Sequence, residues 1–113
     1  MRALIFLFGL CLMFATMANA ASEAESTYKA RCANCHGEKG DGNGHAQMKI
    51  KPEDLRSEIV QKKSDEELYN AIALGVGHVE YPHAFSKRGL NPAQIQDLVG
   101  YIRTFAAASK KNK

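Results

Sequence analysis

The pentapeptide Cys32-Ala33-Asn34-Cys35-His36 places two thiols and an imidazole side by side in the chain. The pattern C-x-x-C-H is typical of covalent haem attachment, because each thiol can add to one vinyl group of the same porphyrin while the adjoining imidazole binds the iron. The sequence therefore predicts that Cys32 and Cys35 anchor a haem and that His36 is its proximal iron ligand. A single motif of this kind predicts one haem c per chain.

A zinc site or a redox-active dithiol would also use a C-x-x-C pair. Thioredoxin-like dithiols accompany a βαβ pattern, which this sequence lacks. A structural zinc site needs further ligands at workable spacing, and His36 fits neither alternative well. Covalent haem attachment is therefore the favoured interpretation of the motif.

Residues 1–20 have the pattern of a secretory signal peptide. Arg2 is followed by the apolar run 3–18, which closes on the small-x-small sequence Ala18-Asn19-Ala20. Cleavage there would export residues 21–113 to the periplasm, with no stable membrane insertion. The alternative is an uncleaved N-terminal anchor, for which the run is short. Cys11 would leave with the leader, so the mature chain would keep only the two cysteines of the haem motif.

The remaining chain is long enough for one small domain. Domains of this size bury a modest fraction of their surface, and a bound haem would add apolar surface to the core. The formal net charge of +3 is small. The basic C-terminal stretch 110–113 is most simply a solvated tail, so the sequence predicts no nucleic-acid partner.

The pattern along the chain predicts an all-α fold. Capping boxes at 22–25 and 64–67 are expected to begin two helices, the second of which Gly75 ends. Asn91 and Pro92 are expected to begin a third helix. The Gly-rich segment 37–51 lacks hydrophobic periodicity and is predicted to be a loop. The last helix has a strongly periodic apolar face, formed by Ile95, Leu98, Val99, Ile102 and Phe105.

Residues 21–113 resemble the class I (mono-haem) cytochrome c family. The similarity covers the helix that ends in the haem motif, the Gly-rich loop, the helix from Leu68 to Gly75 and the closing segment 98–105. The resemblance implies a small helical domain wrapped round one covalently attached haem, with its first and last helices crossing. It also implies a monomeric carrier of single electrons, not an enzyme. Its partners would be a reductase, a terminal oxidase or another periplasmic oxidoreductase.

The sixth iron ligand is where this sequence departs from that family. Members usually carry Met-Pro ahead of the last helix, with the methionine sulfur on the iron, whereas here Tyr81 precedes Pro82. Met48 is the only methionine after the leader, and it lies in the Gly-rich loop. Methionine coordination at the usual position is therefore not expected.

Several residues are candidates for the distal position. Tyr81 stands in the right place, but a phenol must ionise to bind well and would favour ferric iron. His83 and His78 offer neutral imidazoles that serve both oxidation states, although each requires a shifted loop. Met48 or His45 would serve if the Gly-rich loop crossed to the distal side. A site left open would instead suit a sensor of nitric oxide or carbon monoxide, or a small peroxidase-like protein.

Other residues are predicted to support the haem. The resemblance places a proline carbonyl as acceptor for the second ring N–H of the proximal histidine, and Pro52 is the match. Pro52 would otherwise simply end the loop before a short helical turn. Five apolar positions would either line the haem or pack in the core without touching it: Tyr28, Leu68, Ile72, Leu98 and Ile102.

Overall fold

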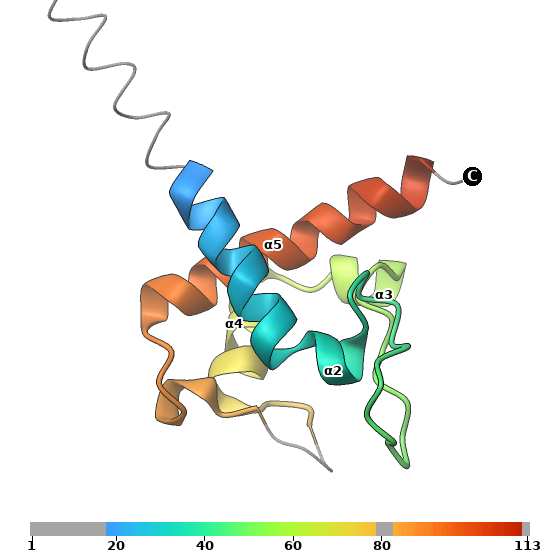
Figure 1. Cartoon of the computed structure of the whole chain (residues 1–113), viewed down its shortest axis with the longest axis horizontal. Helices are drawn as coiled ribbons and strands as arrows, with labels where there is room; N and C mark the ends of the chain where they lie inside the picture. The colour runs from blue at the N-terminus through green and yellow to red at the C-terminus, as the bar shows by residue number, and fades with distance from the viewer. Residues whose placement is uncertain (1–17, 79–82, 112–113) are drawn as a thin grey trace, which may run out of the picture.

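The computed structural model describes residues 18–78 and 83–111, and all of their regular structure is helical (Figure 1). An N-terminal helix runs through residues 18–31. It is followed by α2 (Ala33–His36), α3 (Glu58–Gln61), α4 (Asp65–Leu74), the short 3-10 helix η1 (Phe85–Lys87) and α5 (Pro92–Lys111). No strand occurs in these two ranges. The predicted all-α class is confirmed.

The N-terminal helix crosses α5, as Figure 1 shows. Tyr28 is fully buried at the crossing. Its ring centroid lies 5.3 Å from that of Tyr101 and 5.2 Å from that of Phe105. Tilted and edge-to-face aromatic pairs of this kind stabilise a contact beyond the area they bury. The crossing of the first and last helices therefore rests on a cluster of aromatic rings.

Side-chain caps begin α4 and α5 as predicted. The Ser64 hydroxyl accepts a hydrogen bond from the Glu67 amide at 3.1 Å, and the Glu67 carboxylate accepts one from the Ser64 amide at 2.7 Å. Gly75 ends α4 with a left-handed φ of 79°. Asn91 and Gln94 form a second reciprocal pair, at 2.9 and 3.0 Å, around the start of α5. These caps satisfy amides that have no partner within their own helix.

The predicted cap at Ser22 is wrong. Residues 18–21 are themselves helical, so Ser22 lies inside the N-terminal helix instead of at its start. The preceding turn supplies the carbonyl partners that a cap would replace. The Ser22 carbonyl in turn accepts a hydrogen bond from the Ser26 hydroxyl at 3.0 Å.

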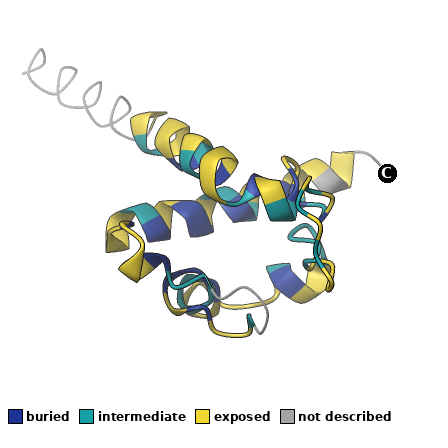
Figure 2. Cartoon of the chain, turned by 60° about the horizontal axis from the view of Figure 1, so that its bottom comes forward, coloured by how far each residue is buried: buried dark blue, intermediate teal, exposed yellow. Residues whose placement is uncertain are grey.

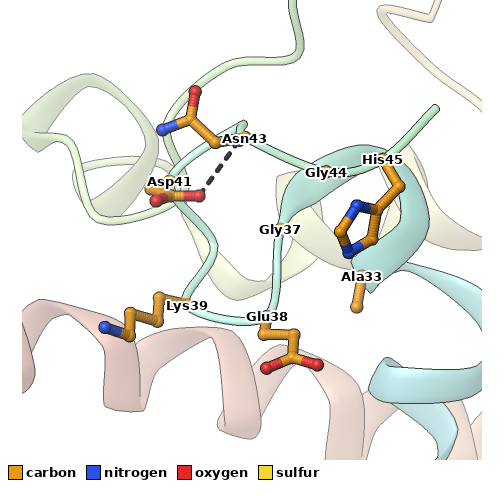
Figure 3. A pocket seen from close by; sticks show the side chains of 8 residues that line it. All are labelled: Ala33, Gly37, Glu38, Lys39, Asp41, Asn43, Gly44 and His45. Carbon is orange, nitrogen blue, oxygen red and sulfur yellow. Dashed lines mark hydrogen bonds between the residues drawn. The ribbon is translucent and has the colours of Figure 1, made fainter. Parts of the chain in front are cut away.

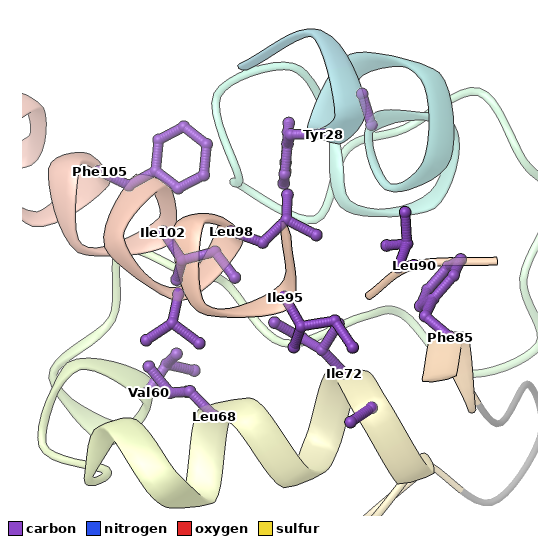
Figure 4. Packing of buried hydrophobic residues seen from close by; sticks show 13 residues of the cluster. Tyr28, Val60, Leu68, Ile72, Phe85, Leu90, Ile95, Leu98, Ile102 and Phe105 are labelled. Carbon is purple, nitrogen blue, oxygen red and sulfur yellow. The ribbon is translucent and has the colours of Figure 1, made fainter. Parts of the chain in front are cut away.

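The core forms where α5 meets α4 and the N-terminal helix (Figure 4). All five residues of the apolar face predicted for α5, from Ile95 to Phe105, are buried. Figure 2 shows them as dark segments of this helix. Burial of one large apolar side chain contributes about 1.5–3 kcal/mol. The five residues expected either in the haem pocket or in the core all belong to this buried cluster: Tyr28, Leu68, Ile72, Leu98 and Ile102.

Polar contacts attach the connection between α3 and α4 to α5. The Arg103 guanidinium donates to the backbone carbonyls of Gln61 at 2.9 Å and Lys63 at 2.6 Å, and it pairs with the Asp65 carboxylate at 2.7 Å. The Gln61 amide group donates to the Ile102 carbonyl at 3.1 Å. These bonds hold α4 in place against the long helix. Within residues 18–78 and 83–111, no helix combines the length and apolarity needed to cross a bilayer.

The hydroxyl of Tyr28 links the helix crossing to the segment that follows His36, because it donates a 2.7 Å hydrogen bond to the Gly37 carbonyl. We expect Tyr28→Phe to lower the free energy of unfolding by roughly 1–3 kcal/mol, since a buried carbonyl is left without its donor. Denaturant titration measures the change. The matched control is Tyr101→Phe, which alters the neighbouring ring without removing a hydrogen bond found among the described residues. Equal stability of the two variants would contradict this role for Tyr28.

Candidate haem site

The motif at residues 32–36 forms a single helical turn. The amides of Cys35 and His36 both donate to the Cys32 carbonyl, at 3.1 and 2.9 Å. Side chains three and four positions apart share one face of a helix. The two thiols and the imidazole therefore point to the same side of α2. Both cysteines are free and partly buried.

The electrostatics of Cys32 do not suit a redox-active dithiol. Burial raises the pKa of the Cys32 thiol to about 11, and the nearby positive charge of Arg31 only partly opposes that effect. Reactive dithiols have lowered pKa values, because the thiolate is the nucleophile. At this position, the raised pKa is more compatible with a structural anchor than with a nucleophilic thiol.

The Gly-rich loop, residues 37–51, folds back on the motif and has no regular structure, as predicted. The Gly42 amide donates to the His36 carbonyl at 2.8 Å. Gly37 has a φ of 81°, and a side chain there would collide with the Asp41 carboxylate. A Cβ at Gly40 would lie 2.8 Å from the Phe105 ring. The glycines are needed because the loop turns tightly between the motif and α5.

A pocket of about 260 Å³ is lined by residues of this loop and by Ala33 of α2 (Figure 3). Its lining includes His45 and the Asp41 carboxylate, which accepts a 3.0 Å hydrogen bond from the Asn43 amide. None of the three histidines described below lines it. His45 is exposed and Met48 is partly buried on the same loop. The pocket is a surface depression of the loop, separate from the histidine cluster.

Three imidazoles from distant parts of the sequence meet next to α2. His36, His78 and His83 offer ligand atoms that lie within 4.8 Å of one another. The ring centroids of His36 and His83 are 5.8 Å apart, and those of His78 and His83 are 3.6 Å apart. The fold therefore brings two predicted distal candidates to the predicted proximal ligand. Tyr81, the other leading candidate, lies outside the described residues.

A hydrogen bond to α4 fixes the orientation of His83. Its Nδ1 lies 2.9 Å from the Ala71 carbonyl. Because a carbonyl only accepts, Nδ1 must carry the proton, which leaves the lone pair of Nε2 free. A backbone carbonyl that takes the second ring N–H is the usual partner of a metal-binding histidine.

The backbone beside His83 adopts an uncommon conformation. Ala84 has a φ of 47°, and the left-handed region costs a residue other than glycine about 1–2 kcal/mol. The Ser86 hydroxyl donates to the Ala73 carbonyl at 2.6 Å and attaches η1 to the end of α4. The turn at Ala84 leads the chain from His83 into this contact. The sequence did not predict the contact of His83 with Ala71, because the acceptor is a backbone carbonyl. It did not predict the left-handed conformation of Ala84 either, because alanine carries no signal for it.

Burial keeps the imidazoles neutral. It lowers the pKa values of His36 and His83 to about 4, with a smaller contribution in the same direction from His78. Burial also lowers the pKa of His78. Neutral imidazole is the form that binds metals, so all three side chains are ready to act as ligands near neutral pH.

The residues present fit a haem iron held between His36 and His83. Imidazole nitrogens bind metals at roughly 2.0–2.1 Å. The ligand atoms of the three histidines lie within 4.8 Å of one another, so two of these side chains could bind the same iron. The Nδ1 atom of His36 is buried and has no hydrogen-bond partner among the described residues. The neighbouring thiols of Cys32 and Cys35 supply the two anchors that a porphyrin with two vinyl groups requires.

Among the described residues, His36 Nδ1 has no hydrogen-bond partner, so the bond predicted from it to the Pro52 carbonyl is not seen. The Pro52 carbonyl faces Gly42, where it would lie 2.6 Å from an added Cβ. Because Gly42 has no side chain, the two backbones approach closely at this point.

Comparison with known proteins gives one family. A family model described as Cytochrome c matches residues 21–106, a range that includes the motif, the Gly-rich loop, α4, the three histidines and most of α5. No curated protein matches the chain. The matched domain implies a covalently bound haem c with iron and a role in electron transfer. By its sequence, its helical fold and this match, the chain belongs to the cytochrome c family.

Proposed function

We propose that the protein binds one haem c through Cys32 and Cys35, with His36 and His83 as the two axial ligands, and carries single electrons between redox proteins. The observation that carries the proposal is the placement of two neutral imidazoles whose ring centroids are 5.8 Å apart beside a pair of free thiols. When bound, haem iron supplies a one-electron couple whose potential depends on the axial ligands and the local dielectric.

The surrounding residues suit electron transfer that involves little movement. Neutral imidazole ligates both ferrous and ferric iron, so the ligand set need not change between oxidation states. The Ala71 carbonyl holds the His83 ring, and the Tyr28 hydroxyl ties the segment after His36 to the N-terminal helix. Ligands that are fixed in advance reduce the rearrangement that accompanies each electron transfer.

The competing function is a sensor of nitric oxide or carbon monoxide, or a small peroxidase-like protein. Either needs an iron face that an external molecule can occupy. The presence of His78 and His83 together near His36 favours a filled distal position, and hence the carrier. The remaining alternative is Tyr81 as the distal ligand. If Tyr81 binds the iron, Tyr81→Phe should change the ferric spectrum and leave the ferrous spectrum nearly unaltered.

The proposed setting is the periplasm. The leader pattern at 1–20 supports export, and the family match begins at residue 21. The partners proposed for the exported, monomeric domain are a reductase and a terminal oxidase or another periplasmic oxidoreductase.

Removal of the thiols tests covalent attachment. We expect Cys32→Ala and Cys35→Ala each to reduce strongly the yield of protein that keeps its haem after denaturation, and we expect the double variant to retain none. Each substitution removes one of the two thioether bonds. Haem staining of denaturing gels and the mass of the intact protein measure the effect. Wild-type retention of haem by the double variant would overturn the assignment.

The spectrum tests the absence of a methionine ligand. The ferric protein should lack the weak charge-transfer band of sulfur-bound haem, and its reduction potential should be lower than in relatives with Met/His ligation, because methionine raises the potential. Met48→Leu should leave both properties unchanged, because the proposed iron ligands are His36 and His83. Met48 is the residue to test, since it is the only methionine after the leader. A sulfur band that disappears in Met48→Leu would show that the Gly-rich loop supplies the ligand.

The mature N-terminus tests export. Holoprotein purified from cells that process secretory leaders should begin at Ala21, and Ala20→Arg should block cleavage, because signal peptidase requires a small residue there. Intact-mass measurement distinguishes the two forms. A wild-type product that retains residues 1–20 would favour the uncleaved anchor.

A further inference from the structure

We propose that His78 is a second distal ligand that can replace His83 at the haem iron. The inference rests on the proposed function, because it assumes a haem held from one side by His36. The ring centroids of His78 and His83 are only 3.6 Å apart, and both residues offer ligand atoms within 4.8 Å of the one offered by His36. An iron with one proximal histidine needs a single distal imidazole, so one of the pair is surplus.

The two distal rings are held differently. The His83 ring is committed at Nδ1 by its hydrogen bond to the Ala71 carbonyl. The Nδ1 atom of His78 is buried and has no hydrogen-bond partner among the described residues. A buried polar nitrogen without a partner is costly. Binding to a metal through this nitrogen would provide the missing partner.

Both histidines are attached to the same end of α4. The His78 amide donates to the Gly75 carbonyl at 3.0 Å, directly after the helix. His83 is attached one turn earlier, through Ala71. Because the last turn of α4 and the turn that follows it hold the two residues next to each other, loss of one ring from the iron would leave the other close by.

The exchange itself is a simple ligand substitution. The bond between iron and His83 Nε2 breaks, and a bond between iron and a ring nitrogen of His78 forms. Both ligands are neutral imidazoles, so no proton or electron moves and the iron keeps its oxidation state. The consequence is that the distal position stays filled when His83 dissociates, which keeps external ligands such as carbon monoxide away from the iron.

The test uses holoprotein variants and their visible spectra, with and without carbon monoxide. We expect His83→Ala and His78→Ala each to remain six-coordinate and low-spin, because the other imidazole occupies the distal position. The double variant should become high-spin in the ferrous state and bind carbon monoxide rapidly, and added imidazole should restore its low-spin spectrum. The matched control is His45→Ala, which removes an exposed histidine outside the cluster.

Failure of this inference is distinguishable from failure of the proposed ligand set. If His83→Ala alone has the high-spin spectrum of the double variant, His78 does not substitute, while the His36 and His83 assignment stands. If instead His78→Ala alone opens the iron, His83 is not the resident ligand and the proposed ligand set fails. If both single variants and the double variant stay low-spin, the distal ligand lies outside this pair and both proposals fall.

A kinetic measurement covers the case in which His83→Ala gives too little holoprotein. Carbon monoxide reaches the iron only when the resident ligand has left, and it then competes with recapture by the distal rings. We expect His78→Ala to bind carbon monoxide faster than the wild type while its spectrum without gas stays the same. Equal binding rates in the two proteins would overturn the substitution by His78.

Discussion

The hydrogen bond between His83 Nδ1 and the Ala71 carbonyl is the contact on which the candidate ligand set depends. It selects one tautomer of the imidazole and leaves Nε2 as the free nitrogen. It also connects the segment ahead of α5 to α4, so the position of His83 is determined by a helix and not by the loop that carries it. Without this bond, the ring would keep its chemistry but lose its orientation toward His36.

The rest of the domain holds the two sides of that site together. α5 packs against α4, and the segment that follows α4 contains both distal histidines. α5 also crosses the N-terminal helix, which leads into the haem motif (Figure 1). The Arg103 contacts to the carbonyls of Gln61 and Lys63 attach the connection between α3 and α4 to α5. The strain at Ala84 is tolerated because Phe85 is buried in the core and Ser86 bonds to α4. α5 therefore fixes the position of the haem motif relative to the segment that contains His78 and His83.

Much of this architecture could be predicted from the sequence, because local signals decide it. The caps at Ser64 and Asn91 and the apolar face of α5 depend on neighbouring residues, and each formed as expected. The prediction of a cap at Ser22 was wrong, because a capping pattern does not show whether the preceding residues are also helical. The role of Pro52 stays a prediction, because the partner of a backbone carbonyl depends on the fold of the whole loop. The sequence proposed both His78 and His83 but could not choose between them, since their approach to His36 is a tertiary contact.

Nuclear magnetic resonance of the ferrous holoprotein tests the central claim most directly. The ring current of a haem shifts the protons of its axial ligands strongly upfield, and residue-specific assignment identifies which side chains they belong to. The account predicts shifted imidazole protons from His36 and His83 and no shifted methionine methyl group. A shifted methyl resonance from Met48, or shifted imidazole protons from His36 alone, would contradict it.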